Sequence, residues 1–143
     1  MNFSTHINTS KEKVWEVLWN DATYRKWTSV FSESSHVVTD WEEGSKVLFL
    51  DGKGSGMVSK IETKKPNELM TFKHLGVVAD GVEDTSSEKI SGWAGALESY
   101  RLKESGGGTL LEVEVDINDD FKDYMSQTFP KALDLVKELS ENK

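Results

Sequence analysis

The sequence has 143 residues, of which 36% are hydrophobic, and it contains five tryptophans. This size and composition predict one folded domain spanning residues 1–143, because a chain of this length buries about two thirds of its unfolded surface. The formal net charge of -8 disfavours nucleic acid and anionic membrane surfaces as partners, since both are bound through clustered Lys and Arg. The absence of cysteine excludes disulfides, a thiolate nucleophile and cysteine-type zinc sites.

The first residues carry no basic stretch followed by an apolar run, so we expect no signal peptide. No window approaches the roughly 18 apolar residues that a membrane-spanning helix needs. Both observations favour a cytoplasmic protein without a membrane span.

The N-terminal part of the chain predicts one strand followed by two short helices. Apolar and polar residues alternate from Phe3 to Ile7, which is typical of a strand with one buried face. Thr9 or Ser10 then supplies an N-cap for a helix over residues 10–19. Asp21 is expected to cap a second short helix.

Six further strands follow at regular intervals and indicate an antiparallel meander. They are predicted at residues 36–41, 46–50, 56–61, 69–75, about 93–103 and 109–117. Asp51-Gly52 is a hairpin signal, whereas Gly106–Gly108 predicts a loose turn. The polar stretch 79–92 is expected to form a long loop of the kind that often serves as a lid or binding loop.

Apolar residues recur at three- and four-residue steps from Phe121 to Leu139 and predict a C-terminal helix. Pro130 lies within it, so either the helix kinks there or a new helix starts at that residue. The fold class is therefore α+β, with a curved antiparallel sheet of six to seven strands wrapped around a long C-terminal helix. We expect space to remain between the sheet and this helix.

The histidines and acidic residues do not form a metal-binding pattern. His6, His36 and His74 are far apart in sequence, and the acidic residues of the 79–92 stretch lack the spacing of a calcium loop. We therefore expect neither a metal nor another cofactor. His74 is the exception among the histidines, because it can share a strand face with Phe72 and reach a pocket.

The strand around Glu98 carries the strongest candidate for acid–base chemistry. Glu98 and Tyr100 share one strand face, and Arg101 lies on the other. A Glu or Tyr that projects into an apolar pocket could act as a general acid. We favour the alternative that these residues form a charge ladder on the outer face, and we assign no catalytic residue.

A set of apolar side chains, with His74, is predicted to enclose a small-molecule pocket between the sheet and the last helix. The predicted ligand-binding residues are Trp27, Phe31, Phe49, Met57, Phe72, His74, Trp93, Leu97, Val113, Val115, Phe121, Met125, Phe129 and Leu133.

Short motifs spread over nearly the whole chain resemble a known superfamily. They are residues 10–18 (SKEKVWEVL), 24–27 (YRKW), 41–45 (WEEGS), 92–96 (GWAGA), 107–111 (GGTLL) and 129–137 (FPKALDLVK). Their order and spacing resemble the START-like, helix-grip superfamily, also called SRPBCC. The resemblance is narrower to the activator of heat-shock-protein-90 ATPase homologue-like group.

The resemblance implies a cavity that holds lipids, sterols, polyketides or other apolar molecules, but it does not imply one activity. The superfamily contains carriers, sensors, cyclases and chaperone regulators. We favour non-catalytic binding of a hydrophobic or aromatic small molecule. The first alternative is a module that interacts with a chaperone or another protein. The second alternative is a cyclase- or hydrolase-like enzyme, which requires an ionisable side chain with a perturbed pKa inside the cavity.

Overall fold

The computed structural model describes residues 1–86, 94–117 and 119–141. The strands are β1 (Asn2–Ile7), β2 (His36–Val38), β3 (Lys46–Leu50), β4 (Gly56–Lys65), β5 (Leu69–Ala79), β6 (Val82–Asp84), β7 (Leu97–Ser105) and β8 (Gly108–Val115). The helices are α1 (Lys11–Trp19), α2 (Asp21–Trp27) and α4 (Lys122–Glu141), with 3₁₀ turns at η1 (Thr28–Val30) and η2 (Asp119–Phe121).

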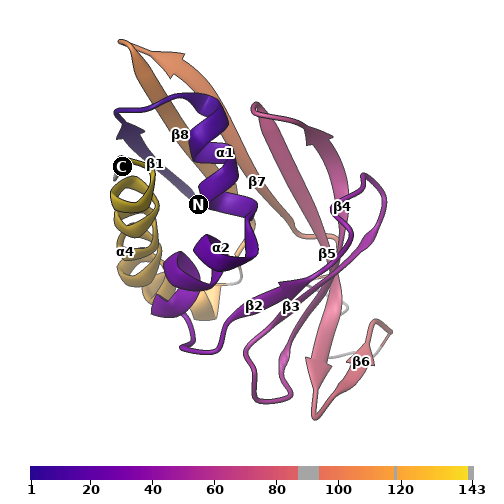
Figure 1. The fold of residues 1–143 in the computed structure, drawn as a ribbon. Helices are drawn as coiled ribbons and strands as arrows, with labels where there is room; N and C mark the ends of the chain where they lie inside the picture. The colour runs from indigo at the N-terminus through magenta and orange to yellow at the C-terminus, as the bar shows by residue number, and fades with distance from the viewer. Residues whose placement is uncertain (87–93, 118, 142–143) are drawn as a thin grey trace.

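The strands form one eight-stranded antiparallel sheet in the order β1-β8-β7-β5-β4-β3-β2, with β6 paired to β5. The sheet curves around α1, α2 and α4, which all lie on one of its faces (Figure 1). This arrangement confirms the predicted α+β helix-grip fold, with β6 as a strand that the sequence pattern did not predict.

The alternating pattern of the last strand places one row of residues in the core. Leu111, Val113 and Val115 are buried, and the intervening Glu112 and Glu114 are more exposed. β1 pairs with this strand, with Phe3 opposite Val113. The two strands thus present a continuous apolar surface to the helices.

Side-chain caps start the two short helices. The Ser10 hydroxyl accepts a hydrogen bond from the Lys13 backbone N–H at 3.3 Å, as predicted for α1. The cap of α2 is Asn20, whose Oδ1 accepts from the Ala22 N–H at 3.0 Å. The prediction that Asp21 is this cap was wrong, because Asp21 already lies in the first turn, where its carboxylate pairs with Arg25.

Several predicted strand boundaries differ from the structure: β4 and β5 extend further than predicted, and β7 and β8 are shifted by a few residues. The 36–41 strand ends at Val38, and Trp41 adopts a φ of 63°, which an extended strand does not allow. The hairpin that Asp51-Gly52 indicates is present, because β3 and β4 pair antiparallel with residues 51–55 as the connecting loop. The conformation of this loop is held by the Asp51 carboxylate, which accepts from the backbone N–H groups of Lys53 and Ser55.

The glycine-containing turns are tighter than predicted. Ser105 pairs directly with Gly108, so Gly106 and Gly107 form a two-residue turn in which both have positive φ. Asp80 and Gly81 form a similar turn between β5 and β6. The predicted 79–92 loop therefore begins as a hairpin, and residues 87–93 lie outside the described part of the chain.

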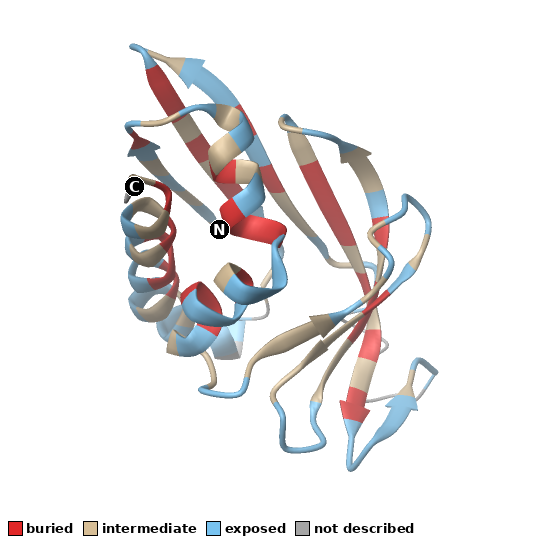
Figure 2. Cartoon of the chain, in the orientation of Figure 1, coloured by how far each residue is buried: buried red, intermediate tan, exposed pale blue. Residues whose placement is uncertain are grey.

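The C-terminal helix is one continuous segment of 20 residues with Pro130 inside it, so the predicted alternative of a new helix starting at Pro130 was wrong. Its buried residues are Phe129, Ala132, Leu133, Val136 and Ser140. They lie on the side of the helix that faces the rest of the molecule (Figure 2).

We predict that Leu133→Ala lowers the free energy of unfolding by about 2–5 kcal/mol, because a buried leucine loses both its burial and its packing contacts. Urea unfolding measures the change. Asp134→Ala, at the next and exposed position of α4, is the matched control and is expected to change stability by less than about 0.5 kcal/mol. Equal effects of the two substitutions would contradict the packing described for α4.

Candidate ligand-binding cavity

A cavity of about 560 Å³ lies between the sheet and the helices α2 and α4. This volume falls within the roughly 300–1,000 Å³ that small-molecule sites occupy. Its wall is largely aromatic. The aromatic lining residues are Trp19, Tyr24, Trp27, Phe31, Phe49, Phe72, Tyr100, Phe121, Tyr124 and Phe129.

Most of the residues predicted to bind a ligand border this cavity. They are Trp27, Phe31, Phe49, Met57, Phe72, His74, Val115, Phe121, Met125 and Phe129. That a ligand contacts them stays a prediction.

Three of the predicted residues that the structure describes are not among the lining residues. Val113 and Leu133 are buried in the core. Leu97 is 39% exposed, because the alternation of β7 turns Glu98 and Tyr100 toward the cavity and leaves Leu97 on the opposite face. Trp93 lies outside the described residues.

Three polar side chains on adjacent strands form a connected cluster at the cavity wall, which we call the His74–Glu98–Tyr100 cluster. His74 Nε2 lies 3.1 Å from Glu98 Oε1, and the Tyr100 hydroxyl donates to Glu98 Oε2. The side chain of Glu98 is only 15% exposed, and that of His74 is nearly covered. The outer-face ladder favoured from the sequence was therefore wrong for Glu98 and Tyr100, whereas Arg101 is exposed on the other face.

A β-bulge in β5 places His74 in this cluster. Val58 pairs with Gly76, but the next residue, Ser59, pairs with His74, so Leu75 is the extra residue. The bulge reverses which positions of β5 face the cavity. Phe72 and His74 therefore line the cavity before the bulge, and Val77 lines it after the bulge.

Ser59 extends the cluster behind the cavity wall. Its Oγ lies 2.6 Å from His74 Nδ1. The resulting order of serine, imidazole and carboxylate has the connectivity of a hydrolase triad. However, Ser59 is 0% exposed and is not a lining residue, so its hydroxyl cannot reach a molecule in the cavity. We therefore assign Ser59 the role of orienting His74.

The environment of the cluster fixes the charge states of its acidic groups. Burial would raise the pKa of Glu98, but the hydrogen bond and charge of His74 and the hydrogen bond from Tyr100 hold it below its ordinary value. Burial and the neighbouring Glu98 charge both raise the pKa of Tyr100, and the same two causes raise the pKa of Tyr24. The carboxylate is thus ionised at neutral pH, and both phenols are neutral.

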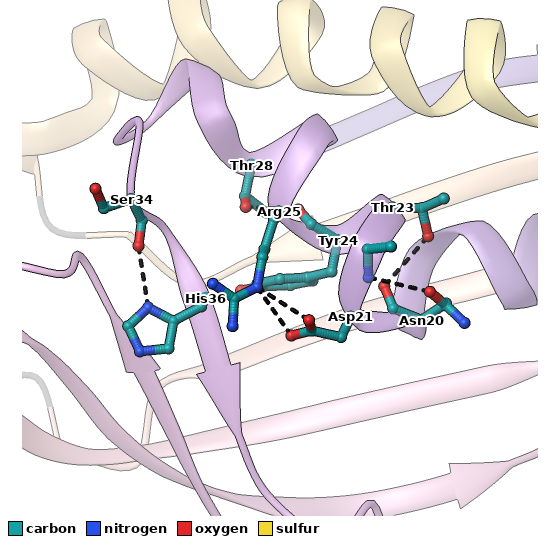
Figure 3. A network of polar contacts seen from close by, with 9 residues as sticks. Asn20, Asp21, Thr23, Tyr24, Arg25, Thr28, Ser34 and His36 are labelled. Atoms are coloured by element: carbon teal, nitrogen blue, oxygen red, sulfur yellow. Dashed lines mark hydrogen bonds and ion pairs between the residues drawn. The ribbon is translucent and has the colours of Figure 1, made fainter.

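The short helix α2 contributes Tyr24 and Trp27 to the cavity while its charges point away from it. Arg25 pairs with both carboxylate oxygens of Asp21, at 3.1 and 3.0 Å, on an exposed part of the helix (Figure 3). The Thr28 hydroxyl donates to the Tyr24 carbonyl at 2.6 Å and stabilises the end of α2. The Trp27 indole N–H donates to the Leu18 carbonyl, which anchors α2 against α1.

Sequence reasoning omitted Tyr24, Glu98 and Tyr100 from the predicted lining. Tyr24 could have been found, because it lies three residues before Trp27 and therefore on the same helix face. The facing of Glu98 depends on strand register, which the sequence did not determine.

Within the part of the chain that the structure describes, no group of three His, Asp or Glu side chains is placed to hold a metal ion. Across the same residues, no helix has both the length and the apolar character needed to span a membrane. The cytoplasmic location stays a prediction.

Solved structures with similar folds come from several bacteria. The structure of the Aha1 dimer from Colwellia psychrerythraea has a TM-score of 0.74 and 19% sequence identity, with 99% of this chain and 95% of that chain covered. CalU16 from Micromonospora echinospora has a TM-score of 0.68 and 18% identity over 97% of this chain and 74% of that chain. A protein from Cytophaga hutchinsonii has a TM-score of 0.68 and 20% identity, covering 99% and 92%.

These identities establish similarity of fold and do not establish a shared ligand or activity. No curated protein matches the chain by sequence. Residues 8–141 match the family described as Activator of Hsp90 ATPase homolog 1-like protein, which is nearly the whole chain. The protein therefore belongs to the Activator of Hsp90 ATPase homolog 1-like family.

Proposed function

We propose that the protein binds a hydrophobic or aromatic small molecule in the cavity between the sheet and α4 and does not change it chemically. The observation that carries the proposal is an aromatic-lined cavity of about 560 Å³ with one buried polar cluster in its wall. Small-molecule sites typically combine apolar walls with a few polar groups that orient the ligand.

The apolar wall supplies the free energy for binding. A ligand that buries about 200 Å² of apolar surface gains about 5 kcal/mol at about 25 cal/mol per Å², before the costs of immobilisation are subtracted. Met57 and Met125 both line the cavity. Their flexible side chains allow the wall to adapt to ligands of different shapes.

The arrangement of the polar groups favours binding over catalysis. Ser59 cannot reach the cavity. Glu98 is engaged by His74 and Tyr100, and its lowered pKa makes it a weaker base than an ordinary glutamate. These groups are therefore suited to hold and orient a ligand.

The family suggests a second candidate function, which is interaction with an Hsp90-type chaperone. Two aromatic side chains at the cavity, Phe121 and Tyr124, are 59% and 47% exposed and could contact a protein. If this function holds, adding the protein raises the ATPase rate of Hsp90 from the same organism. The double substitution Phe121→Ala and Tyr124→Ala then reduces the increase, and an unchanged ATPase rate with the unsubstituted protein counts against the candidate.

We predict that Met57→Trp weakens ligand binding by about tenfold or more, because the larger side chain fills the cavity. An amide NMR titration with sterols, flavonoids, fatty acids and aromatic acids identifies a bound class and measures its affinity. Leu48→Trp is the matched control, since Leu48 lies on the neighbouring strand β3 and does not line the cavity. Loss of binding in both variants, or in neither, would contradict the assigned site.

We predict that Glu98→Gln lowers the free energy of unfolding at neutral pH by about 2 kcal/mol, since the buried charge-assisted hydrogen bonds are weakened. Because the folded-state pKa of Glu98 is depressed, its contribution is complete above the unfolded pKa of about 4.3 and is lost as the pH falls through the folded value. Below about pH 4.3, the stability of the Glu98→Gln variant should therefore depend less on pH than that of the unsubstituted protein.

Urea unfolding from neutral pH downward measures both effects. Glu62→Gln, which removes an exposed partner of Lys60, is the control and is expected to shift stability by less than about 0.5 kcal/mol. A Glu98→Gln variant as stable as the control would show that the cluster does not hold an ionised carboxylate.

A further inference from the structure

The charged groups that line the cavity are mainly acidic. Among the described residues, the lining includes Asp51, Glu98 and Asp116 and no Lys or Arg. The imidazole of His74 is the remaining ionisable basic side chain in this lining, and it is paired with Glu98 at 3.1 Å. An anionic group that entered the cavity would therefore meet negative charge without a free cationic partner.

The Glu98 carboxylate has capacity for a further hydrogen bond. A carboxylate offers about four acceptor positions, and the described contacts to Glu98 are one from His74 and one from Tyr100. A hydroxyl group of a ligand can donate to one of the remaining positions. A ligand carboxylate at the same place would instead lie beside the Glu98 carboxylate in a poorly solvated site, where like charges repel and no Lys or Arg of the described lining offsets its desolvation.

The other polar side chains of the lining suit a neutral ligand head. Thr28, Ser32 and Ser35 are lining residues with hydroxyl side chains. Tyr24 contributes a phenol that burial and the Glu98 charge keep neutral by raising its pKa, against the opposing effect of its hydrogen bond to Ser35. A ligand ammonium group would be attracted by Glu98, but that carboxylate is already engaged by His74. The desolvation cost of a cation in this apolar cavity would then be poorly offset.

From this lining we infer that the cavity selects neutral amphiphiles whose apolar, preferably aromatic, body ends in a hydroxyl group, and that it rejects anionic amphiphiles such as fatty acids. The inference rests on the proposed function and narrows it. The hydroxyl donates to Glu98, and the aromatic walls cover the apolar body.

Three probes that share one skeleton test this selectivity with the unmodified protein. Pyrenebutanol, pyrenebutyrate and pyrenebutylamine differ only in a neutral, anionic or cationic end group at about pH 7. Fluorescence titration gives the dissociation constant of each. We expect pyrenebutanol to bind about tenfold or more tightly than pyrenebutyrate, and also more tightly than pyrenebutylamine.

The Glu98→Gln variant identifies the residue responsible. Removing the negative charge should tighten pyrenebutyrate binding and so reduce the ratio of its dissociation constant to that of pyrenebutanol. Glu62→Gln, on the exposed side of β4, should leave this ratio unchanged. If a folded Glu98→Gln protein keeps the same ratio of the two dissociation constants, the role of Glu98 is overturned. The comparison of the three probes in the unmodified protein does not depend on this variant.

The outcomes separate the inference from the proposed function. Binding of pyrenebutyrate or pyrenebutylamine as tightly as pyrenebutanol, with loss of binding in Met57→Trp, would overturn the selectivity and leave the binding function in place. If none of the three probes binds and the NMR titration also detects no ligand, the proposed function fails and the inference fails with it.

Discussion

The packing of the C-terminal half of α4 against β1, α1 and α2 is the constraint on which the rest of the structure depends. Its central contact is the ring of Phe129, which stacks on Phe3 with the ring centroids 4.8 Å apart and meets Phe31 edge-on. The buried residues of the helix all lie from Phe129 onward. Phe121, in η2 just before the helix, and Tyr124, in its first turn, stay exposed, and the cavity lies beside them.

The difference between the buried C-terminal half of α4 and its exposed first turns explains how a protein with a well-packed core retains an interior space. The C-terminal end of α4 and the strands β1 and β8 bury apolar side chains densely, which stabilises the fold independently of any ligand. Near the N-terminal end of α4, aromatic rings from α2, β3 and β5 and that of Phe31, which follows η1, surround the cavity. A ligand there would cover apolar surface that the protein itself leaves unpacked.

The His74–Glu98–Tyr100 cluster places fixed polar groups at one position in the otherwise apolar wall of the cavity. Two adjacent strands, β5 and β7, bring the cluster together, and its carboxylate is held ionised by its two neighbours. Burying a charge is costly unless it is paired, so the cluster has to be satisfied within the protein before a ligand arrives. This favours a role in orientation and selection, for which a fixed polar group is needed, over a role as a nucleophile.

The sequence determined the features that depend on neighbouring residues in the chain. The alternation in β1 and β8, the Ser10 cap and the periodicity of α4 predicted these elements, and their order together with the motifs predicted the helix-grip fold. Local hydrogen bonds and side-chain periodicity decide such features, so they are visible in a single sequence.

The tertiary structure alone decided which strand residues face the cavity. The bulge at Leu75 reverses the facing of β5, and the register of β7 turns Glu98 and Tyr100 inward and Leu97 outward. A shift of one residue inverts every facing assignment in a strand, and register is fixed by pairing with strands distant in sequence. The acidic, hydroxyl-lined character of the cavity could therefore be recognised only after the strands were assembled.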